Sequence, residues 1–155
     1  MNTILKLILS LLLPLALGAV AGMFTAQAVP EWYASLVRPS IAPPNTVFGP
    51  VWTALYILMG VSFFLIWKAP AGRTRNNAMI IYFVQLLLNF GWSFFFFYFK
   101  NIGLALVEII ILWVFLVLML IFFHRVRPLA AYINIPYLLW VTFAAFLNAA
   151  YFALN

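Results

Sequence analysis

Five long stretches of this chain contain almost no charged residue, and this pattern limits the folds that the chain can adopt. Each is about twenty residues long, the length of helix that crosses a hydrocarbon core roughly 30 Å thick. Hydrophobic residues make up 68% of the 155 residues and charged residues only 6%, which is typical of membrane proteins. We therefore predict an all-α integral membrane bundle, forming one domain over 1–155, with five transmembrane helices. They should lie near 5–27, 47–67, 78–99, 102–123 and 131–152.

The positive charges lie between these stretches, singly or in small groups, as loop anchors do. The net charge of +6 is therefore no sign of a nucleic-acid partner, and we expect none. The N-terminus and the second and fourth connections share one side of a five-span protein, and most basic residues belong to that side. The positive-inside rule then predicts a cytoplasmic N-terminus in a bacterial inner membrane. That side holds Lys6, Lys68, Arg73, Arg75, Arg125 and Arg127, and the other side holds Arg38 and Lys100.

The first stretch has two interpretations. Lys6, the apolar run after it and the tripeptide Ala26-Gln27-Ala28 resemble a secretory signal with an A-x-A cleavage site. The uncharged part, 7–30, is longer than the apolar core of a usual signal. Gly18 and Gly22 also have the small-xxx-small spacing that suits close helix packing in lipid. We favour a retained span over a cleaved signal.

The chain offers few groups for metal or redox chemistry. It has no cysteine, which excludes disulfides and thiolate sites. Its only histidine, His124, ends an apolar run beside Arg125 with no second ligand of suitable type nearby. We interpret it as an interfacial residue. We predict no metal site, no catalytic residue and no required cofactor.

Glu108 is the only acidic residue inside a predicted span. An intramembrane carboxylate is by default a candidate functional group. Alternatively, its side chain reaches the interface or pairs there with nearby Lys100. Both interpretations remain open at this point.

Most other polar residues within the spans are uncharged, and amides share helical faces with tryptophans. An unpaired amide in hydrocarbon is costly, so such a face should either line a protein cavity or bind another helix. Faces of the second, third and fifth spans each carry a tryptophan, and two of them also carry an amide. We expect these faces to enclose a pocket for a flat, apolar molecule. Its residues would be Trp52 and Tyr56, then Gln85, Asn89 and Trp92, and finally Trp140, Ala144 and Asn148.

The connection 28–46 is the only long loop, and loops of this length often form lids or binding elements. Four prolines, among them Pro43 and Pro44, should stiffen it. Trp32 and Tyr33 lie near its start, where they are either aromatic anchors at the interface or part of the binding element.

Several short motifs follow one another along nearly the whole chain. They are Trp32-Tyr33, Pro39-Ser40, Pro43-Pro44, Phe48-Gly49-Pro50-Val51-Trp52-Thr53, Leu55-Tyr56, Met59-Gly60, Trp67, Gln85, Leu88-Asn89, Trp92-Ser93, Pro136-Tyr137, Trp140, Phe143-Ala144 and Leu147-Asn148. This ordered series resembles the translocator protein family, also called tryptophan-rich sensory proteins (TspO) or peripheral benzodiazepine receptors.

The resemblance implies a five-helix bundle that often forms homodimers, with a pocket open toward the first loop. It implies porphyrins such as protoporphyrin IX and haem as ligands. For mitochondrial members it also implies cholesterol and isoquinoline or benzodiazepine drugs. By motif, Trp52 and Trp140 match pocket residues, Gln85 and Asn89 match a polar wall, and Ala144 matches a position where size affects binding. Tyr33, Pro43 and Pro44 match the lid.

One departure concerns sterols. The family's cholesterol motif requires a basic residue after its tyrosine, but Tyr151 is followed only by Phe152, Ala153, Leu154 and Asn155. The predicted function is therefore porphyrin binding for sensing, transport or regulation of tetrapyrrole levels. Two alternatives remain: light- and oxygen-dependent breakdown of the bound porphyrin, and a transporter of sterols or other small molecules with Glu108 as its only candidate coupling acid.

Overall fold

The apolar stretches form helices because a chain in hydrocarbon must pair its backbone N–H and C=O groups internally. The computed structural model describes residues 1–155 and contains helices but no strand. Five helical segments are long and apolar enough to cross a membrane, which confirms the predicted all-α, five-span class. The α-helices are α1 (Thr3–Ala28), α2 (Phe48–Trp67), α3 (Arg73–Ser93), α4 (Ile102–Val126), α5 (Pro128–Ile133) and α6 (Ile135–Leu154).

Two short π-helical turns extend the helices at one end of the bundle. η1 (Val29–Tyr33) continues α1, and η3 (Phe94–Tyr98) continues α3. The prediction of a loop over all of 28–46 was therefore wrong at its start. Pro30 does not stop the helix because the chain continues past it as the π-turn η1, a local adjustment by which transmembrane helices tolerate proline. A 3₁₀ turn, η2 (Asn45–Val47), leads into α2.

The predicted fifth span consists of two helices that meet at Asn134. Pro136 lies in the first turn of α6, and proline cannot donate the backbone hydrogen bond that would continue α5. The Asn134 side chain holds the junction: its Nδ2 donates to the Ser62 Oγ at 2.7 Å and to the Ala130 carbonyl at 3.0 Å. The break is thus buried and hydrogen-bonded to α2.

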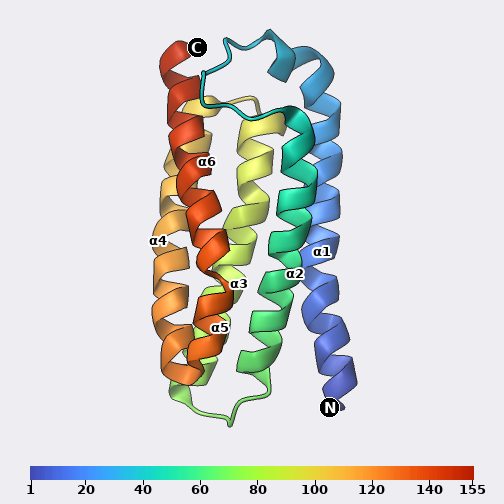
Figure 1. Cartoon of the computed structure of the whole chain (residues 1–155), viewed down its shortest axis with the longest axis vertical. Helices are drawn as coiled ribbons and strands as arrows, with labels where there is room; N and C mark the ends of the chain where they lie inside the picture. Colours follow the sequence, from blue (N-terminus) through green and yellow to red (C-terminus); the bar gives the residue numbers. More distant parts are fainter.

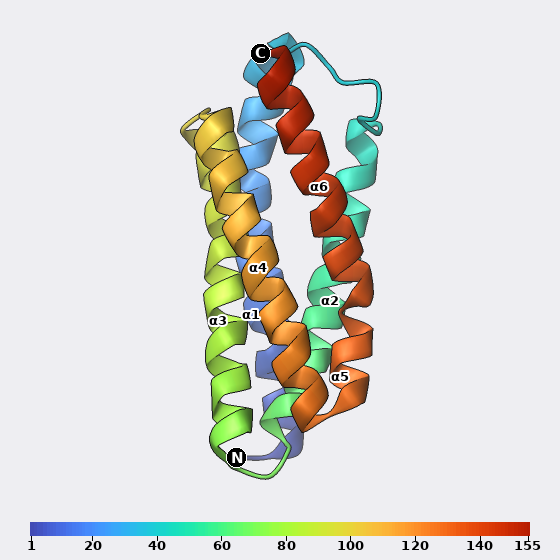
Figure 2. The ribbon, with the colours of Figure 1, turned by 90° about the vertical axis from the view of Figure 1, so that its left-hand side faces the viewer.

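The helices form an elongated bundle (Figures 1 and 2). The most extensive contacts join α3 with α4 and α1 with α2. The N-terminus, the α2–α3 connection and the α4–α5 hairpin lie at one end of the bundle. The C-terminus and the segment 34–46, which we call the lid, lie at the other. α2 packs on α5 near the first end but separates from α6 toward the lid in both views.

The half of the bundle away from the lid is tightly packed. Phe63 stacks on Tyr82 with ring centroids 4.4 Å apart, and Tyr82 stacks in turn on Phe123.

Glycine brings α1 close to α2, because a Cβ at Gly18 would overlap the Tyr56 ring. Gly22, one turn further along α1, differs: no atom lies within 4 Å of an added Cβ. The small-residue stripe of α1 therefore serves helix packing only in part.

Candidate ligand-binding cavity

A cavity of about 540 Å³ lies between α1, α2, α3 and α6 beneath the lid. This volume falls within the range of small-molecule sites. Its 25 lining residues include no acid, no lysine, no arginine and no histidine. The cavity can therefore bind a ligand through apolar contact and neutral hydrogen bonds, but it provides no general acid or base.

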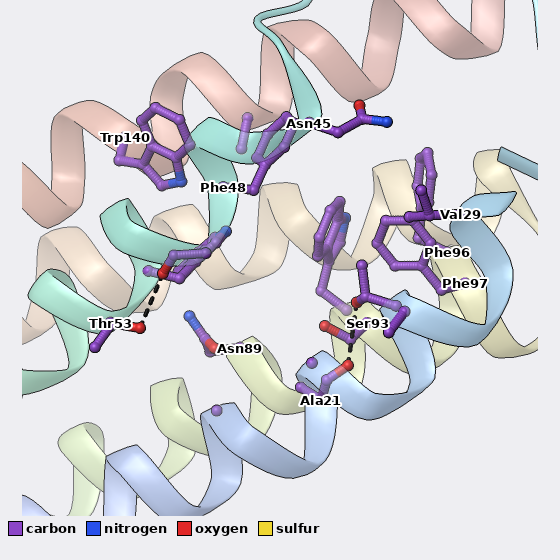
Figure 3. Close-up of a pocket in the computed structure, with 18 of the residues that line it drawn as sticks. Ala21, Val29, Asn45, Phe48, Thr53, Asn89, Ser93, Phe96, Phe97 and Trp140 are labelled. Atoms are coloured by element: carbon purple, nitrogen blue, oxygen red, sulfur yellow. Dashed lines mark hydrogen bonds between the residues drawn. The ribbon is translucent and has the colours of Figure 1, made fainter. Parts of the chain in front are cut away.

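Aromatic rings from α2 and α6 form one wall. The Trp52 ring stacks on Tyr56 at 5.7 Å and meets Trp140 edge-on at 6.4 Å, with an angle of 86° between the planes. Phe48 also packs edge-on against Trp140, with ring centroids 6.0 Å apart. Figure 3 shows Phe48 and Trp140 on this side and Val29, Phe96 and Phe97 across the cavity. The walls thus present ring faces and edges on opposite sides, a surface suited to a flat conjugated ligand.

The floor of the cavity is a chain of hydrogen bonds that crosses three helices. The Tyr56 hydroxyl donates to Asn89 Oδ1 at 2.8 Å, and Asn89 Nδ2 donates to the Tyr137 hydroxyl at 2.8 Å. The Tyr137 hydroxyl donates in turn to Gln85 Oε1 at 2.7 Å. Each of these four residues is buried. The network satisfies the polar groups of Tyr56, Asn89 and Tyr137, which would be costly in hydrocarbon, and it fixes the orientation of the Asn89 amide; Gln85 Nε2 has no partner.

A second amide orients the tryptophan of α3. The Trp92 Nε1–H donates to Asn148 Oδ1 at 2.9 Å, and Asn148 Nδ2 donates to the Ile102 carbonyl at 3.1 Å. Trp92 also packs against Phe96 with centroids 5.2 Å apart. The indole is therefore held by Asn148 of α6, whose amide is itself anchored to α4, while its ring borders the cavity.

The end of α6 is hydrogen-bonded both to η1 and to the lid. The hydroxyl groups of Tyr33 and Tyr151 are hydrogen-bonded at 2.8 Å. One turn further on, the Val37 N–H donates to Asn155 Oδ1 at 2.9 Å, and Asn155 Nδ2 donates to the Val37 carbonyl at 3.2 Å. These contacts close the lid-side end of the cavity against α6.

Comparison of the sequence with known protein families assigns the chain to one of them. The family model described as "TspO/MBR family" matches residues 10–154.

The chain belongs to the TspO/MBR family.

It is 40% identical to the tryptophan-rich protein TspO of Archaeoglobus fulgidus over 152 residues, 98% of each chain. It is 39% identical to the protein of the same name from Chlorobaculum tepidum over 156 residues, 98% of this chain and 97% of the relative. The human translocator protein is 39% identical over 120 residues, which cover 76% of this chain and 71% of the human protein. The resemblance inferred from the motifs is confirmed, as is an integral, multi-pass membrane protein.

In this TspO/MBR protein, most of the residues predicted for the pocket line the cavity. Gln85 does not: it lies behind the floor, where it accepts a hydrogen bond from Tyr137. Pro43 and Pro44 do not line it either, although the Pro43 carbonyl accepts a hydrogen bond from Arg38 that folds the lid on itself. The predicted residues that do line it are Tyr33, Trp52, Tyr56, Asn89, Trp92, Trp140, Ala144 and Asn148.

Sequence reasoning missed the wall that α1 contributes. Small residues, with Ala21, Gly22 and Thr25 among them, face the cavity from this helix. Of these only Gly22 was considered, and its spacing from Gly18 was interpreted as helix packing. Phe96 and Phe97 were also missed, because the π-turn η3 changes the number of residues per turn and rotates side chains away from the face expected for an α-helix.

Glu108 fits neither sequence interpretation completely. It is buried between α3 and α4, next to Gly91, so it does not reach the interface. Neither carboxyl oxygen has a hydrogen-bond partner, so it is not paired with Lys100. It does not line the cavity. A carboxyl group at this position therefore contacts no ligand in the cavity directly.

Proposed function

We propose that this TspO/MBR protein binds a tetrapyrrole, with protoporphyrin IX as the representative ligand, for sensing, transport or regulation of tetrapyrrole levels at the membrane. The observation that carries this proposal is the aromatic, uncharged cavity. Trp52, Trp92 and Trp140 border one space of about 540 Å³. Rings that present both faces and edges gain most from a rigid, flat ligand, which loses little conformational entropy on binding.

The carboxylates of a porphyrin set its orientation in this proposal. Burying a carboxylate without a partner is costly, and the cavity contains no cation. The acidic edge should therefore lie toward the lid. Arg38 is there, exposed and hydrogen-bonded to Asn45, which lines the cavity.

The residues that line the cavity suit contact with the porphyrin ring better than they suit coordination of an iron ion at its centre. Haem proteins hold iron through His, Cys, Met or Tyr, and no His, Cys or Met lines the cavity. Two of the three lining tyrosines, Tyr33 and Tyr151, are hydrogen-bonded to each other, and Tyr56 donates to Asn89. We expect metal-free protoporphyrin to bind as tightly as haem, because binding would come from the ring system rather than from iron ligation.

The decisive experiment is a titration of the purified protein with protoporphyrin IX, followed by quenching of tryptophan fluorescence. We expect saturable quenching that is weakened by Trp52→Ala and by Trp140→Ala. Trp113→Ala is the matched control, because Trp113 is exposed on α4, is hydrogen-bonded to Thr142 and does not line the cavity. If all three variants bind like the parent, the ligand lies elsewhere.

A second candidate function is light- and oxygen-dependent breakdown of the bound porphyrin. The close approach of Trp52 and Trp140 favours it, because oxidisable indoles would lie against an excited macrocycle that generates reactive oxygen. No general acid or base is needed. Illumination in air should bleach bound porphyrin faster than free porphyrin, and Trp52→Phe and Trp140→Phe should slow this step. Equal bleaching with and without protein would exclude it.

The same cavity would take other flat aromatic molecules. We propose that isoquinoline and benzodiazepine drugs compete with protoporphyrin, as family membership implies. Displacement of bound porphyrin by such a drug, lost in parallel in Trp52→Ala, is the expected result. Non-competitive behaviour would separate the two sites.

We further propose a homodimer in a bacterial inner membrane with a cytoplasmic N-terminus. The basic residues support this orientation, since most lie at the end that carries the N-terminus. The chain has no cysteine, so single cysteines at exposed Leu129 and Val37 would report the two sides separately. A membrane-impermeant thiol reagent added outside intact spheroplasts should label the Val37→Cys variant alone.

A further inference from the structure

A groove of about 370 Å³ lies on the outside of the bundle, at the end opposite the lid. It runs between the last turns of α4 and the start of α6, and α5 forms its base. Leu120, Ile121 and Ile135 give it apolar walls, and His124, Arg125 and Tyr132 give it a polar end. It shares no residue with the ligand cavity.

The polar end of the groove presents three hydrogen-bonding side chains. His124 Nε2 lies 3.4 Å from the Tyr132 hydroxyl. The Arg125 guanidinium lies over the Phe122 ring at 5.4 Å from its centroid, with its N–H groups free of any hydrogen bond to protein. Arginine and histidine donors of this kind bind phosphate oxygens.

The charge at this end is positive and has no acidic partner. The chain has two acidic residues, Glu31 and Glu108. Glu31 belongs to η1 at the lid end, and Glu108 is buried between α3 and α4. An anion at Arg125 would therefore meet no repulsion from a neighbouring carboxylate.

Such an end of a transmembrane bundle lies at the level of the lipid headgroups, and the exposed side chains Ile121 and Ile135 would face acyl chains. We propose that the groove binds one anionic phospholipid. Its phosphate would accept hydrogen bonds from His124, Arg125 and Tyr132, and one acyl chain would lie along the apolar walls. This site is independent of tetrapyrrole binding.

The experiment is native mass spectrometry of the purified protein with equal amounts of dioleoyl phosphatidylglycerol and dioleoyl phosphatidylcholine. A basic residue near a membrane surface favours an anionic lipid by about fivefold. The parent should therefore retain one phosphatidylglycerol in preference to phosphatidylcholine. Arg125→Gln should lower this preference about fivefold, and Arg125→Gln with His124→Gln should abolish it.

Lys68→Gln is the matched control. Lys68 also lies at this end and over a phenylalanine ring, Phe64, at 5.2 Å, but outside the groove. It should keep the preference. Equal losses in Lys68→Gln and Arg125→Gln would mean diffuse attraction without a site and would overturn the proposal. Glycerol phosphate that binds as well as the lipid would also overturn it, because no acyl chain would be involved. So would a change in the fraction of dimer without a change in lipid retention, since the groove would then be an interface between copies.

Discussion

A larger side chain at Gly22 of α1 should fill part of the cavity without disturbing the fold, because Gly22 has open space beside it. No atom lies within 4 Å of a Cβ added there, and the residue lines the cavity. Gly22→Leu should therefore fold normally. Replacing a glycine inside a helix by leucine favours the helix by up to about 1 kcal/mol, so the thermal midpoint in detergent should stay the same or rise.

The same leucine would occupy space that the ligand needs. Forcing extra methylene groups into a packed site costs roughly 1–3 kcal/mol, which corresponds to a Kd for protoporphyrin IX that is about five- to 150-fold higher. Fluorescence quenching gives the Kd, and thermal unfolding in the same detergent gives the stability. The expected signature is weaker binding by a protein that is as stable as the parent.

Two glycines provide controls for this prediction. Gly72 also has no atom within 4 Å of an added Cβ, but it lies in the α2–α3 connection. Gly72→Leu should therefore change neither the Kd for protoporphyrin IX nor the thermal midpoint. A Cβ at Gly18 would overlap Tyr56, so Gly18→Leu should lower stability. A stable Gly22→Leu protein with an unchanged Kd would refute the assignment of the cavity as the ligand site.

Three further predictions test the lid, the helix break and the pairing of the ligand with Arg38. Asn155→Ala removes both hydrogen bonds to Val37. It should speed porphyrin dissociation up to about thirtyfold in stopped-flow experiments, since each of the two bonds contributes about 1 kcal/mol net; an unchanged rate would mean that these bonds do not hold the lid over the ligand. Asn134→Ala leaves the buried Ser62 hydroxyl without its donor and should lower stability by roughly 1–3 kcal/mol with an unaltered Kd. Arg38→Gln should weaken protoporphyrin binding up to about fivefold, as expected for an exposed ion pair, but should not affect its dimethyl ester; equal effects on both would remove the proposed pairing.

The five spans could be predicted because hydropathy over twenty residues reports on the transfer of side chains into lipid. The helix class follows because backbone groups in lipid must pair internally. The pocket face of α2 was partly predictable for a related reason. Trp52 and Tyr56 share the expected face and line the cavity, but Phe63 and Trp67 on the same face pack against other aromatic rings and the N-terminal Lys6. Periodicity identifies a protein-facing stripe without saying which part of it meets a cavity.

The remaining features depend on partners that are distant in sequence. Gly18 and Gly22 have the same local pattern, yet one meets Tyr56 and the other meets open space. For Glu108 the sequence left open a functional role and a side chain that reaches or pairs at the interface, and the structure instead places the carboxyl group inside the bundle, next to Gly91 of α3. The break at Asn134 lies within the predicted fifth span, and neither Asn134 nor Pro136 was interpreted as a helix end.

An experimental structure of the protein with protoporphyrin IX bound would test directly whether the cavity is the tetrapyrrole site. We predict density for a flat macrocycle inside the cavity, beside Trp52 and Trp140 and under the lid, with its carboxylates toward Arg38. Density on the lipid-facing surface, or in the groove at His124 and Arg125, with an empty cavity would contradict the account.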